Sequence, residues 1–401
     1  MQTLYICYLS LDEPLVQSQV LPYLRELASA GIKVRLLTFE KDLKQKSADQ
    51  LNATRDALVS QGITWSFLPY HKSPSIPATL YDVLAGAMHL VRLIRKDGVE
   101  VLHARAHIPM AMALIARRLA SCQTVFDLRG LIAEEYVDAG IWQEGSIPFK
   151  AIKWIERAGL RYADQIVVLT NRVREWLIKN NPMLANKITV IPCCVDRSRF
   201  ATNADRADRF ELVYAGSVVG LYRLEEMARF FLALKERRAD AFFRILTHGS
   251  QAKVSEVLHG VGVREDDFEV VAVDPDEVPQ NISRARLGIS FRKPTFSQIA
   301  ASPTKIAEYL AAGIPVVSNA GTGDVDELLQ SERVGLTIHS FDDASLAEAA
   351  TQALKLTGDP EIEARCRRAA AAHFDLGEIG GQRYREVYER IAINRVPWPR
   401  T

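Results

Sequence analysis

The feature that most constrains the fold of this chain is a regular alternation of two kinds of segment. Short apolar runs rich in β-branched residues alternate with longer amphipathic stretches along nearly the whole sequence. This order is typical of parallel sheets whose strands are joined by crossover helices. The pattern stops near residue 191 and restarts near residue 210. The predicted strands are 4–8, 33–38, 64–68, 99–103, 123–127, 165–169 and 187–191 in the first half, and 210–215, 242–247, 268–271, 287–290, 315–318 and 335–338 in the second.

The length of the chain and a polar segment in its middle predict two domains. A sequence of 401 residues is too long for one ordinary core, and residues 196–209 are rich in Asp, Arg and Asn. We therefore expect an α/β protein with two Rossmann-like domains that face each other across a cleft. The first domain is expected at 1–200, the second at 201–377, and a C-terminal helical segment at 378–401.

Composition excludes several classes of protein. Hydrophobic residues make up 48% of the chain, charged residues 25%, and the net charge is +1, so nucleic acid is not expected as a partner. The five cysteines are scattered, which favours reduced thiols and a cytoplasmic location. No run reaches the roughly 18 apolar residues of a membrane-spanning helix.

One segment of the second half carries strong helix signals. Ser302 is a good N-cap, Pro303 suits the first helical position, and Gly313 is a typical helix stop. The free N–H groups at the start of this helix, together with Thr304 and the Lys305 ammonium, suit a diphosphate.

Glu308 lies one turn further along the same helix, where its carboxylate can accept hydrogen bonds from a ribose diol. An ordinary capped surface helix is the alternative interpretation of the whole segment.

The same segment resembles the retaining family-four glycosyltransferases of the GT-B fold. Residues 308–317 read EYLAAGIPVV, close to the family's Glu-Ala-x-Ala-x-Gly-x-Pro-Val-Val helix. Residues 212–217 (LVYAGS) resemble its donor-domain glycine loop, and residues 101–105 (VLHAR) resemble a strand end of its acceptor domain. The resemblance covers nearly the whole chain and implies a metal-independent hexosyltransferase. It also implies that the C-terminal helix crosses back to the first domain.

Two positions depart from the family pattern. The first glutamate of its E-x7-E motif would fall at Ala300, and its customary phosphate-binding Arg and Lys fall near Ser217 and Tyr222. Other basic residues are candidates to supply the missing charge. The residues that the resemblance and the helix signals imply for donor binding are Gly216, Ser217, Arg223, Arg292, Ser302, Thr304, Lys305 and Glu308.

In the first half, charged residues gather at the expected carboxyl ends of neighbouring strands, where open α/β sheets bind ligands. Asp127 and Arg129 follow one strand, and Glu134 and Glu135 come just after them. A structural ion pair between Asp127 and Arg129 is the alternative. The candidate catalytic residues are Arg129, Glu135, Arg105 and His103.

Several weaker sequence signals suggest further binding sites. Gln17, Ser18 and Gln19 are candidates for hydroxyl recognition, and the tripeptides 274–276 and 324–326 match D-x-D at a frequency expected by chance. A basic run interleaved with apolar residues suits either a solvated helix face or contact with the inner face of an anionic membrane. That run consists of Lys150, Lys153, Arg157 and Arg161.

The functional prediction is transfer of a sugar from a nucleotide-diphosphate sugar to an acceptor hydroxyl on a glycan, a lipid-linked molecule or a small molecule. Retention of configuration is implied by the resemblance, and neither a metal nor a further cofactor is expected. A GT-B nucleotide-sugar epimerase, an inverting enzyme with a general base such as His103, and a non-catalytic binding protein remain alternatives.

Overall fold

The computed structural model describes residues 1–200 and 206–393, apart from the side chain of Lys44. The chain forms two compact units, Met1–Ile191 with the described part of Gly380–Thr401, and Pro192–Ile379. The chain therefore passes from the first unit to the second after Ile191 and returns to the first unit after Ile379. The limits expected from the sequence are 200 and 377, nine residues after the first crossing and two residues before the second.

The first unit is built on a seven-stranded sheet of order β3-β2-β1-β4-β5-β6-β7, and all its strand pairs are parallel. Every strand predicted from the apolar runs is present, with ends shifted by three residues at most. The strands are β1 Gln2–Cys7, β2 Lys33–Glu40, β3 Ile63–Pro69, β4 Val101–Arg105, β5 Gln123–Leu128, β6 Gln165–Val168 and β7 Ile188–Val190.

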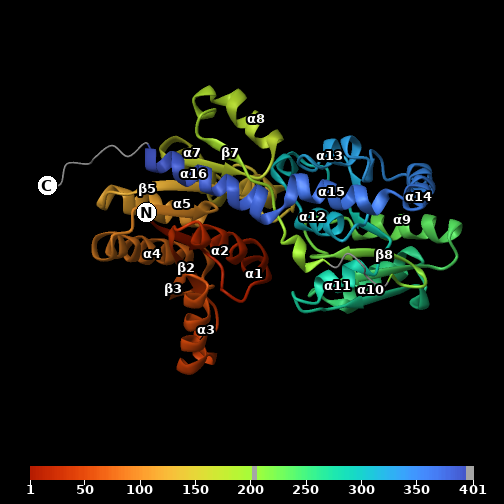
Figure 1. Ribbon diagram of the computed structural model, residues 1–401, viewed down its shortest axis with the longest axis horizontal. Coiled ribbons are helices and arrows are strands. Elements are labelled where there is room, and N and C mark those ends of the chain that lie inside the picture. The colour runs from red at the N-terminus through yellow and green to blue at the C-terminus, as the bar shows by residue number, and fades with distance from the viewer. Residues whose placement is uncertain (201–205, 394–401) are drawn as a thin grey trace. The chain divides into compact units, whose positions relative to one another are not determined.

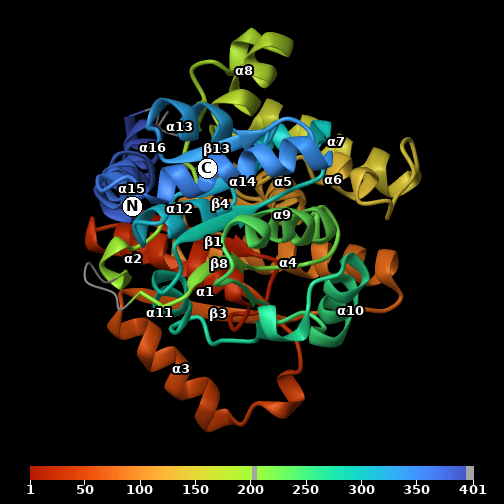
Figure 2. The same cartoon turned by 90° about the vertical axis from the view of Figure 1, so that its right-hand side faces the viewer.

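Helices connect these strands, and the last helix of the chain joins them in the same unit. α3 lies beyond β3 at one edge of the sheet and α8 beyond β7 at the other (Figures 1 and 2). The helices are α1 Pro14–Gln19, α2 Leu21–Ser29, α3 Ala48–Ser60, α4 Ser75–Asp97, α5 His107–Leu119, α6 Ile132–Asp138, α7 Ile147–Tyr162, α8 Asn171–Asn180 and α16 Gln382–Ile393.

The second unit contains a six-stranded parallel sheet of order β10-β9-β8-β11-β12-β13. Its strands are β8 Phe210–Ala215, β9 Ala241–Leu246, β10 Phe268–Val271, β11 Leu287–Ser290, β12 Val316–Asn319 and β13 Gly335–Ile338. Its helices are α9 Leu224–Arg237, α10 Gln251–Val261, α11 Val278–Ser283, α12 Thr304–Ala311, α13 Val325–Ser331, α14 Asp343–Thr357 and α15 Ile362–Phe374.

Strand β8 shows how the sequence divides the core of the second unit into two layers. Phe210, Leu212 and Tyr214 belong to one apolar cluster, which includes buried side chains of α9 and α14. Val213 and Ala215 belong to another, with buried side chains of α12 and α15. Because successive strand residues point to opposite faces, a run in which nearly every residue is apolar indicates a strand covered on both sides. Glu211 is the one charged residue of β8, and it is buried and paired with Arg244.

One predicted helix differs from the structure. The amphipathic pattern of residues 19–30 predicts one helix, but in the structure Gln19 is the last residue of α1 and α2 spans Leu21–Ser29. Val20 has φ −124° and ψ −64°, outside helical geometry, and Pro22 follows two residues later. Pro22 lies in the first turn of α2, where its missing N–H costs no intrahelical hydrogen bond, whereas a helix continuous with α1 would need that N–H, which explains a helix boundary at this place.

Candidate functional site

In the second unit, the strand order reverses between β8 and β11, which lie side by side at the centre of the sheet. Open α/β sheets bind ligands at the carboxyl ends of strands at such a point. The two loops that leave these strands are held together by backbone contacts. Tyr222 and Arg292 form an isolated bridge, and the Arg223 N–H donates to the Phe291 carbonyl over 3.1 Å.

Lys305 of α12 lies between two aromatic rings at this point. Its Nζ atom is 4.2 Å from the ring centre of Tyr222 and 4.5 Å from that of Tyr214, and it donates a hydrogen bond to the Tyr214 hydroxyl over 3.3 Å. The side chain is only 6% exposed. Burial lowers the pKa of Lys305, and the charge of Arg292 adds to this effect while Tyr222 opposes it. The lysine is thus a desolvated cation with no carboxylate bonded to it among the described residues.

Gly216, directly after β8, makes room for this lysine. A Cβ atom at residue 216 would lie 3.1 Å from Nζ of Lys305, and the φ angle of 129° is one that side chains with a Cβ rarely adopt. Gly216 and Ser217 are exposed on the loop, and the Ser217 carbonyl accepts a hydrogen bond from the Tyr214 hydroxyl. The loop therefore leaves exposed backbone beside the Lys305 ammonium.

Arg292, after β11, completes the cationic centre. Its guanidinium lies 4.7 Å from the ring centre of Tyr222, and its Nε donates to Oε1 of the buried Gln298 over 2.5 Å. Its backbone N–H donates to the Asn319 side chain over 2.6 Å. The charge of Lys305 lowers the pKa of Tyr222 despite its burial, and Arg292 contributes to the same shift.

Sequence reasoning missed Tyr222, Tyr214 and Gln298 as members of this site. Tyr222 was available as a signal, because it falls where the resembling family places a basic residue. Gln298 carried no comparable signal, since its role depends on a contact with a residue six positions away in a loop.

The start of α12 differs from the expectation. The helix begins at Thr304, its N-cap is Pro303, and no side chain caps it. The prediction that Ser302 is the N-cap is therefore wrong, because its hydroxyl accepts the Cys193 N–H over 3.1 Å instead. The stop at Gly313 is present with φ 76°, as the helix signals indicated. The first N–H groups of α12 keep no side-chain partner, which leaves them available to an anion.

Glu308 is half-buried one turn after Lys305. Burial raises the pKa of its carboxyl group, and the charges of Lys305 and Arg199 oppose the shift. No hydrogen bond or ion pair to the carboxylate is present within the described part of the chain. The structure therefore leaves this acceptor unpaired next to the cationic centre.

Arg223, another candidate for donor binding, is already engaged by protein groups. Its guanidinium pairs with Glu226 and lies 5.7 Å from the ring centre of Phe341. Ala300 is 2% exposed and follows Gln298 on a short 3-10 helix, Phe296–Ala300. The position of the family's first glutamate is thus filled by a packed methyl group.

The two D-x-D tripeptides show no metal-binding arrangement. Asp276 is exposed and pairs with Arg199 over 3.2 Å, and Asp326 accepts the Gly321 N–H over 2.9 Å. Within residues 1–200 and 206–393 no group of three or more His, Cys, Asp or Glu side chains is placed to hold a metal ion.

In the first unit, Asp127 at the end of β5 is the centre of a fully buried polar cluster. Its Oδ2 accepts hydrogen bonds from the hydroxyls of Tyr5 over 3.3 Å and Tyr384 of α16 over 3.1 Å, and lies 3.7 Å from Nε2 of His103. Arg129 faces the other carboxylate oxygen at 3.5 Å. Burial favours the neutral acid, but Arg129 and His103 hold the pKa of Asp127 below its usual range.

His103 is also fully buried, and a second tyrosine of α16 holds it. Its Nδ1 is hydrogen-bonded to the Tyr388 hydroxyl at 2.8 Å, and the same hydroxyl contacts Thr3 at 2.9 Å. Burial lowers the pKa of His103, with Asp127 opposing. The histidine and the aspartate therefore anchor α16 to the sheet, a role that requires no contact with a substrate.

The remaining first-unit candidates lie around this cluster. Arg105 ends β4, in register with Asp127 on β5. The Glu135 carboxylate lies against Gly130, so closely that a Cβ at residue 130 would collide with it. Glu134 pairs with Lys153 over 2.7 Å. The structure thus places Arg105, His103 and Arg129 together toward the carboxyl ends of β4 and β5. The Glu135 carboxylate lies against the loop that follows β5.

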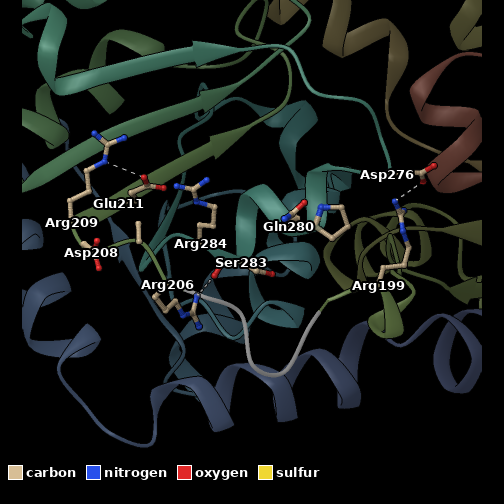
Figure 3. Close-up of a pocket in the computed structure, with 11 residues that line it drawn as sticks. Arg199, Arg206, Asp208, Arg209, Glu211, Asp276, Gln280, Ser283 and Arg284 are labelled. Carbon is tan, nitrogen blue, oxygen red and sulfur yellow. Dashed lines mark hydrogen bonds and ion pairs between the residues drawn. The ribbon is translucent and has the colours of Figure 1, made fainter.

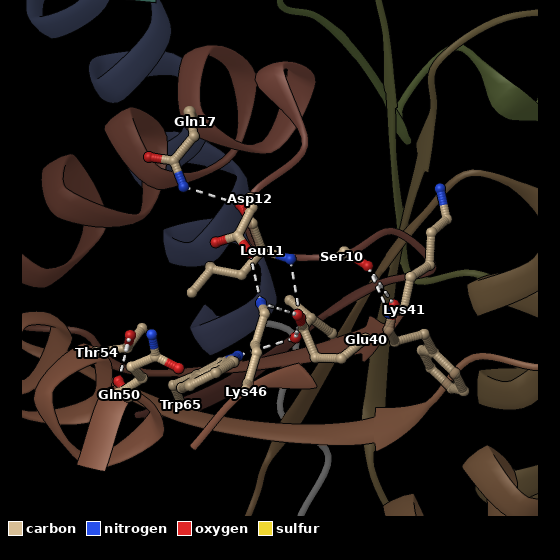
Figure 4. A network of polar contacts seen from close by, with 12 residues as sticks. Ser10, Leu11, Asp12, Gln17, Glu40, Lys41, Lys46, Gln50, Thr54 and Trp65 are labelled. Carbon is tan, nitrogen blue, oxygen red and sulfur yellow. Dashed lines mark hydrogen bonds and ion pairs between the residues drawn. The ribbon is translucent and has the colours of Figure 1, made fainter. Parts of the chain in front are cut away.

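The loop after β1 is fixed by a buried carboxylate at the end of β2 (Figure 4). Glu40 is 1% exposed and accepts hydrogen bonds from the Leu11 N–H over 2.8 Å, the Thr38 hydroxyl over 2.6 Å and Nζ of Lys46 over 3.2 Å. The Gln17 amide donates to the Leu11 carbonyl over 2.8 Å. These bonds define the backbone at the carboxyl end of β1.

Ser18 and Gln19, the other two residues proposed for hydroxyl recognition, do not take part in this network around Glu40. The Ser18 hydroxyl donates to the Pro14 carbonyl over 2.8 Å, one turn earlier in α1. Gln19 is 1% exposed and belongs to the core of the unit.

The basic run on α7 does not form one uniform face. Lys150, Arg157 and Arg161 are exposed, together with Trp154 at 61% and Ile147 at 80%. Lys153 points inward and pairs with Glu134 and Glu156. The expectation that Lys153 belongs to the exposed basic face is therefore wrong, because two half-buried or buried carboxylates bind its ammonium.

A pocket of about 1070 Å³ in the second unit is lined mainly by charged residues, some of which are paired (Figure 3). Arg206 donates to the Ser283 and Ala285 carbonyls over 2.9 and 2.7 Å, and Arg209 pairs with Glu211 over 3.2 Å. Arg206 and Arg209 precede β8, at the amino end of that strand, opposite to the Lys305 centre. We attach no ligand to this pocket, since sheets of this kind bind at the carboxyl ends of their strands.

The two doubly wound units and the Lys305 centre define a two-domain α/β protein with a site suited to a phosphorylated ligand. Residues 16–199 match the family described as Glycosyltransferase Family 4, and residues 210–389 match the family described as Glycosyl transferase-like. The chain belongs to the glycosyltransferases, its first domain to family four, and its fold is GT-B. The resemblance seen in the sequence is thereby confirmed.

Solved structures with the same fold extend over nearly the full length. Sucrose-phosphate synthase from Thermosynechococcus elongatus is 15% identical, with 98% of this chain and 100% of that chain covered and a TM-score of 0.73. HepE from Anabaena, solved with UDP and glucose, is 13% identical, with 97% and 99% covered and a TM-score of 0.68. WaaG, a glycosyltransferase of lipopolysaccharide biosynthesis, is 14% identical, with 96% and 98% covered and a TM-score of 0.69. No curated protein matches the sequence.

Proposed function

We propose that this glycosyltransferase moves a hexose from a nucleotide-diphosphate sugar to an acceptor hydroxyl, with retention of configuration and without a metal ion. The observation that carries this proposal is the Lys305 ammonium, which is desolvated, unpaired with any carboxylate among the described residues, and located where the sheet order reverses. The uncapped start of α12 and the guanidinium of Arg292 add positive potential at the same place.

This arrangement suits a leaving diphosphate. Cleavage of the glycosidic bond increases negative charge on the diphosphate, and fixed cations and N–H groups stabilise that charge most when water is excluded. A cation that already occupies its place needs no divalent metal to neutralise the leaving group. Glu308, one turn along the helix, offers an unpaired acceptor for the ribose hydroxyls.

Retention is proposed because the sequence resembles the retaining family-four enzymes. Among the described residues the donor site has no second carboxylate beside Glu308, so we assign no covalent glycosyl-enzyme intermediate. The family's first glutamate position is the buried Ala300. Attack on the same face as the departing diphosphate is the usual explanation within family four, and the Lys305 centre provides the charge stabilisation that such a step requires. The anomeric configuration of the product, read by NMR, tests this part.

The nucleotide and the sugar are best tested first with uridine diphosphate sugars, because HepE has been solved with UDP and with UDP-glucose. Thermal stabilisation by a panel of nucleoside diphosphates identifies the base, since a ligand at 100 times its Kd adds about 2.7 kcal/mol. Failure of every nucleoside diphosphate to stabilise the protein would overturn the proposal.

Two alternatives predict different products. A nucleotide-sugar epimerase of this fold changes the donor without any acceptor, and a non-catalytic binding protein, which Ala300 would suit, binds nucleotide without turnover. Incubation with the identified donor, with and without acceptor, followed by mass spectrometry of nucleotide and sugar, separates all three.

We further propose that the exposed face of α7 contacts an anionic membrane surface that carries the acceptor. Ile147 and Trp154 are exposed apolar side chains, and Lys150, Arg157 and Arg161 lie on the same face at helical spacing. Apolar side chains flanked by basic ones bind in the plane of a lipid interface. No helix in residues 1–200 or 206–393 has the length and hydropathy to pass through a bilayer, so the contact would be peripheral.

A further inference from the structure

Arg105 is a buried arginine with no hydrogen-bond or ion-pair partner among the described residues. It is 6% exposed, its Nε atom has no access to solvent, and no hydrogen bond or ion pair joins its guanidinium to any described residue. A guanidinium carries five N–H donors and stays charged at any pH a protein tolerates. Burial of such a group without partners is costly, so it indicates a ligand that supplies the missing acceptors.

The nearest carboxylate does not fill this need. Asp127 lies in register with Arg105 on the next strand, but its oxygens face Arg129 and the hydroxyls of Tyr5 and Tyr384. No carboxylate of residues 1–200 or 206–393 lies within ion-pair distance of Arg105. The charge of Asp127 acts on both Arg129 and Arg105 and helps to lower the pKa of that carboxyl, but one carboxylate cannot balance two guanidinium groups, so the carboxyl end of β4 keeps a net positive charge.

The position of Arg105 in the sheet is that of a ligand site. The strand order of the first unit reverses between β1 and β4, and Arg105 is the last residue of β4, in register with Cys7 at the end of β1. Ala106 follows with φ 67°, a value rare for a residue with a Cβ, and the 13-residue helix α5 then starts without a side-chain cap. Positive φ at such a junction is costly and is found mostly at functional sites, and a helix start favours anions.

We propose that Arg105 binds an anionic group of the acceptor, a carboxylate or a phosphate monoester. The inference rests on the proposed function, because it assigns the second substrate of the transferase to the first unit. A planar guanidinium binds such oxyanions through paired N–H donors, which orients the acceptor as well as holding it. The enzyme is therefore selective for acidic acceptors over neutral ones of the same shape.

The first experiment uses inorganic phosphate as the probe and the Lys305→Ala protein as the background, so that the proposed donor site is weakened by the loss of its buried ammonium. Phosphate-dependent thermal stabilisation is expected to persist in this background. Addition of Arg105→Met should reduce phosphate affinity at least tenfold, while Arg118→Met, at an exposed arginine of α5, should leave it unchanged. Equal phosphate affinity with and without Arg105→Met overturns the proposal.

Stability without phosphate provides a second readout. Arg105→Met removes an unpaired buried charge and keeps an apolar side chain of similar length, so its melting temperature should equal or exceed that of the parent. If Arg105 were purely structural, Arg105→Met would lower the melting temperature. If Arg105→Met fails to fold, which by itself contradicts the expectation, Arg105→Lys still tests binding, since a single ammonium should bind phosphate more weakly than the guanidinium.

The acceptor itself is tested with matched pairs, such as glucose against glucose 6-phosphate and glucose against glucuronate, using the donor identified above. Faster transfer to the acidic member, with the preference lost in Arg105→Met, is expected. Equal rates for both members overturn the assignment to the acceptor. Binding of the nucleoside diphosphate should stay unchanged in Arg105→Met, so a failure of donor binding in the parent refutes the proposed function and is distinguished from a failure of this inference.

Discussion

The ammonium of Lys305 lies 4.2 Å from the centre of the Tyr222 ring, a contact between α12 and the loop that follows β8. The ring holds the cation at the carboxyl end of the sheet without neutralising it, because a π face attracts a cation without carrying a net charge. The charge is thus kept available for a ligand.

The first prediction concerns Lys305→Ala. Removal of the ammonium takes away a charge that acts on the departing diphosphate, so kcat should fall about 10²- to 10³-fold and donor binding should weaken as well. Steady-state kinetics with the identified donor measure both quantities. Lys253→Ala, at an exposed lysine of α10, is the control and should behave like the parent. Full turnover by Lys305→Ala would place the donor site elsewhere.

The second prediction concerns pH. Burial keeps the pKa of Lys305 below its ordinary value of 10.5, so the ammonium loses its proton at a lower pH than an exposed lysine does. The affinity for nucleoside diphosphate should therefore fall as pH rises through this lowered pKa. In Lys305→Arg the fall should move to higher pH, because a guanidinium keeps its proton.

Tyr222 must be separated from Lys305 in that measurement, since its pKa is lowered as well, mainly by the lysine charge. In Tyr222→Phe the alkaline loss of affinity should persist. If it disappears in Tyr222→Phe and survives in Lys305→Arg, the tyrosine is the titrating group and the assignment to the lysine is wrong.

The third prediction concerns Glu308→Ala. The carboxylate is proposed to accept hydrogen bonds from a ribose that does not change during the reaction, so its loss affects ground state and transition state equally. KM for the donor should rise about ten- to hundredfold, corresponding to about 1.5 to 3 kcal/mol for hydrogen bonds to a charged group, while kcat stays near the parent value. For a donor that contains 2'-deoxyribose, the same substitution should raise KM by a smaller factor. An equal rise in KM for both donors would contradict the ribose contact.

The fourth prediction concerns the exposed face of α7. Two variants should each reduce sedimentation with vesicles that contain about 30% phosphatidylglycerol. Trp154→Ala removes apolar contact with the lipid, and the double variant Lys150→Ala/Arg157→Ala removes electrostatic attraction. Arg237→Ala, on α9 of the second unit, is the control. Equal sedimentation of all variants would refute the membrane contact.

Most of the fold was predictable because most of its strands are largely buried on both faces. Such strands appear as runs dominated by apolar residues, and all thirteen predicted runs correspond to strands of the two sheets. The break at Val20 was harder to see, since Pro22 is compatible with the first turn of a helix and does not by itself show where that helix begins.

The site was predictable only in part, for a different physical reason. Lys305 and Glu308 stand on one helix at fixed spacing, so their proximity follows from local geometry. The contacts of Tyr222 with Lys305, and of Tyr384 with Asp127, join residues 83 and 257 positions apart. Such contacts depend on how loops and helices pack, which periodicity does not reveal. The contact of Lys153 with Glu134 is of the same kind, since it joins α7 to α6, whereas its contact with Glu156 is a local one within α7.

The last prediction concerns the attachment of α16 to the first unit. The Tyr384 hydroxyl donates a hydrogen bond to the buried Asp127 carboxylate over 3.1 Å, and Tyr384→Phe removes that donor with little change in shape. A hydrogen bond to a charged group contributes about 1.5 to 3 kcal/mol, so the unfolding free energy of the first unit should fall by that amount in urea titrations. Tyr162→Phe, at an exposed tyrosine of α7, should leave it unchanged.

The same variant should alter the response to acid. The pKa of Asp127 is held below its usual range in the folded protein, so its ionisation stabilises the fold above about pH 4 and this stabilisation is lost as pH falls through the folded pKa. Because Tyr384 bonds to the charged form, its removal should raise that pKa, so the acid-dependent loss of stability should be smaller and should be complete at a higher pH than in the parent. If Tyr384→Phe matches the parent in both urea and acid, the hydroxyl does not hold α16 and the helix is retained by its apolar contacts alone.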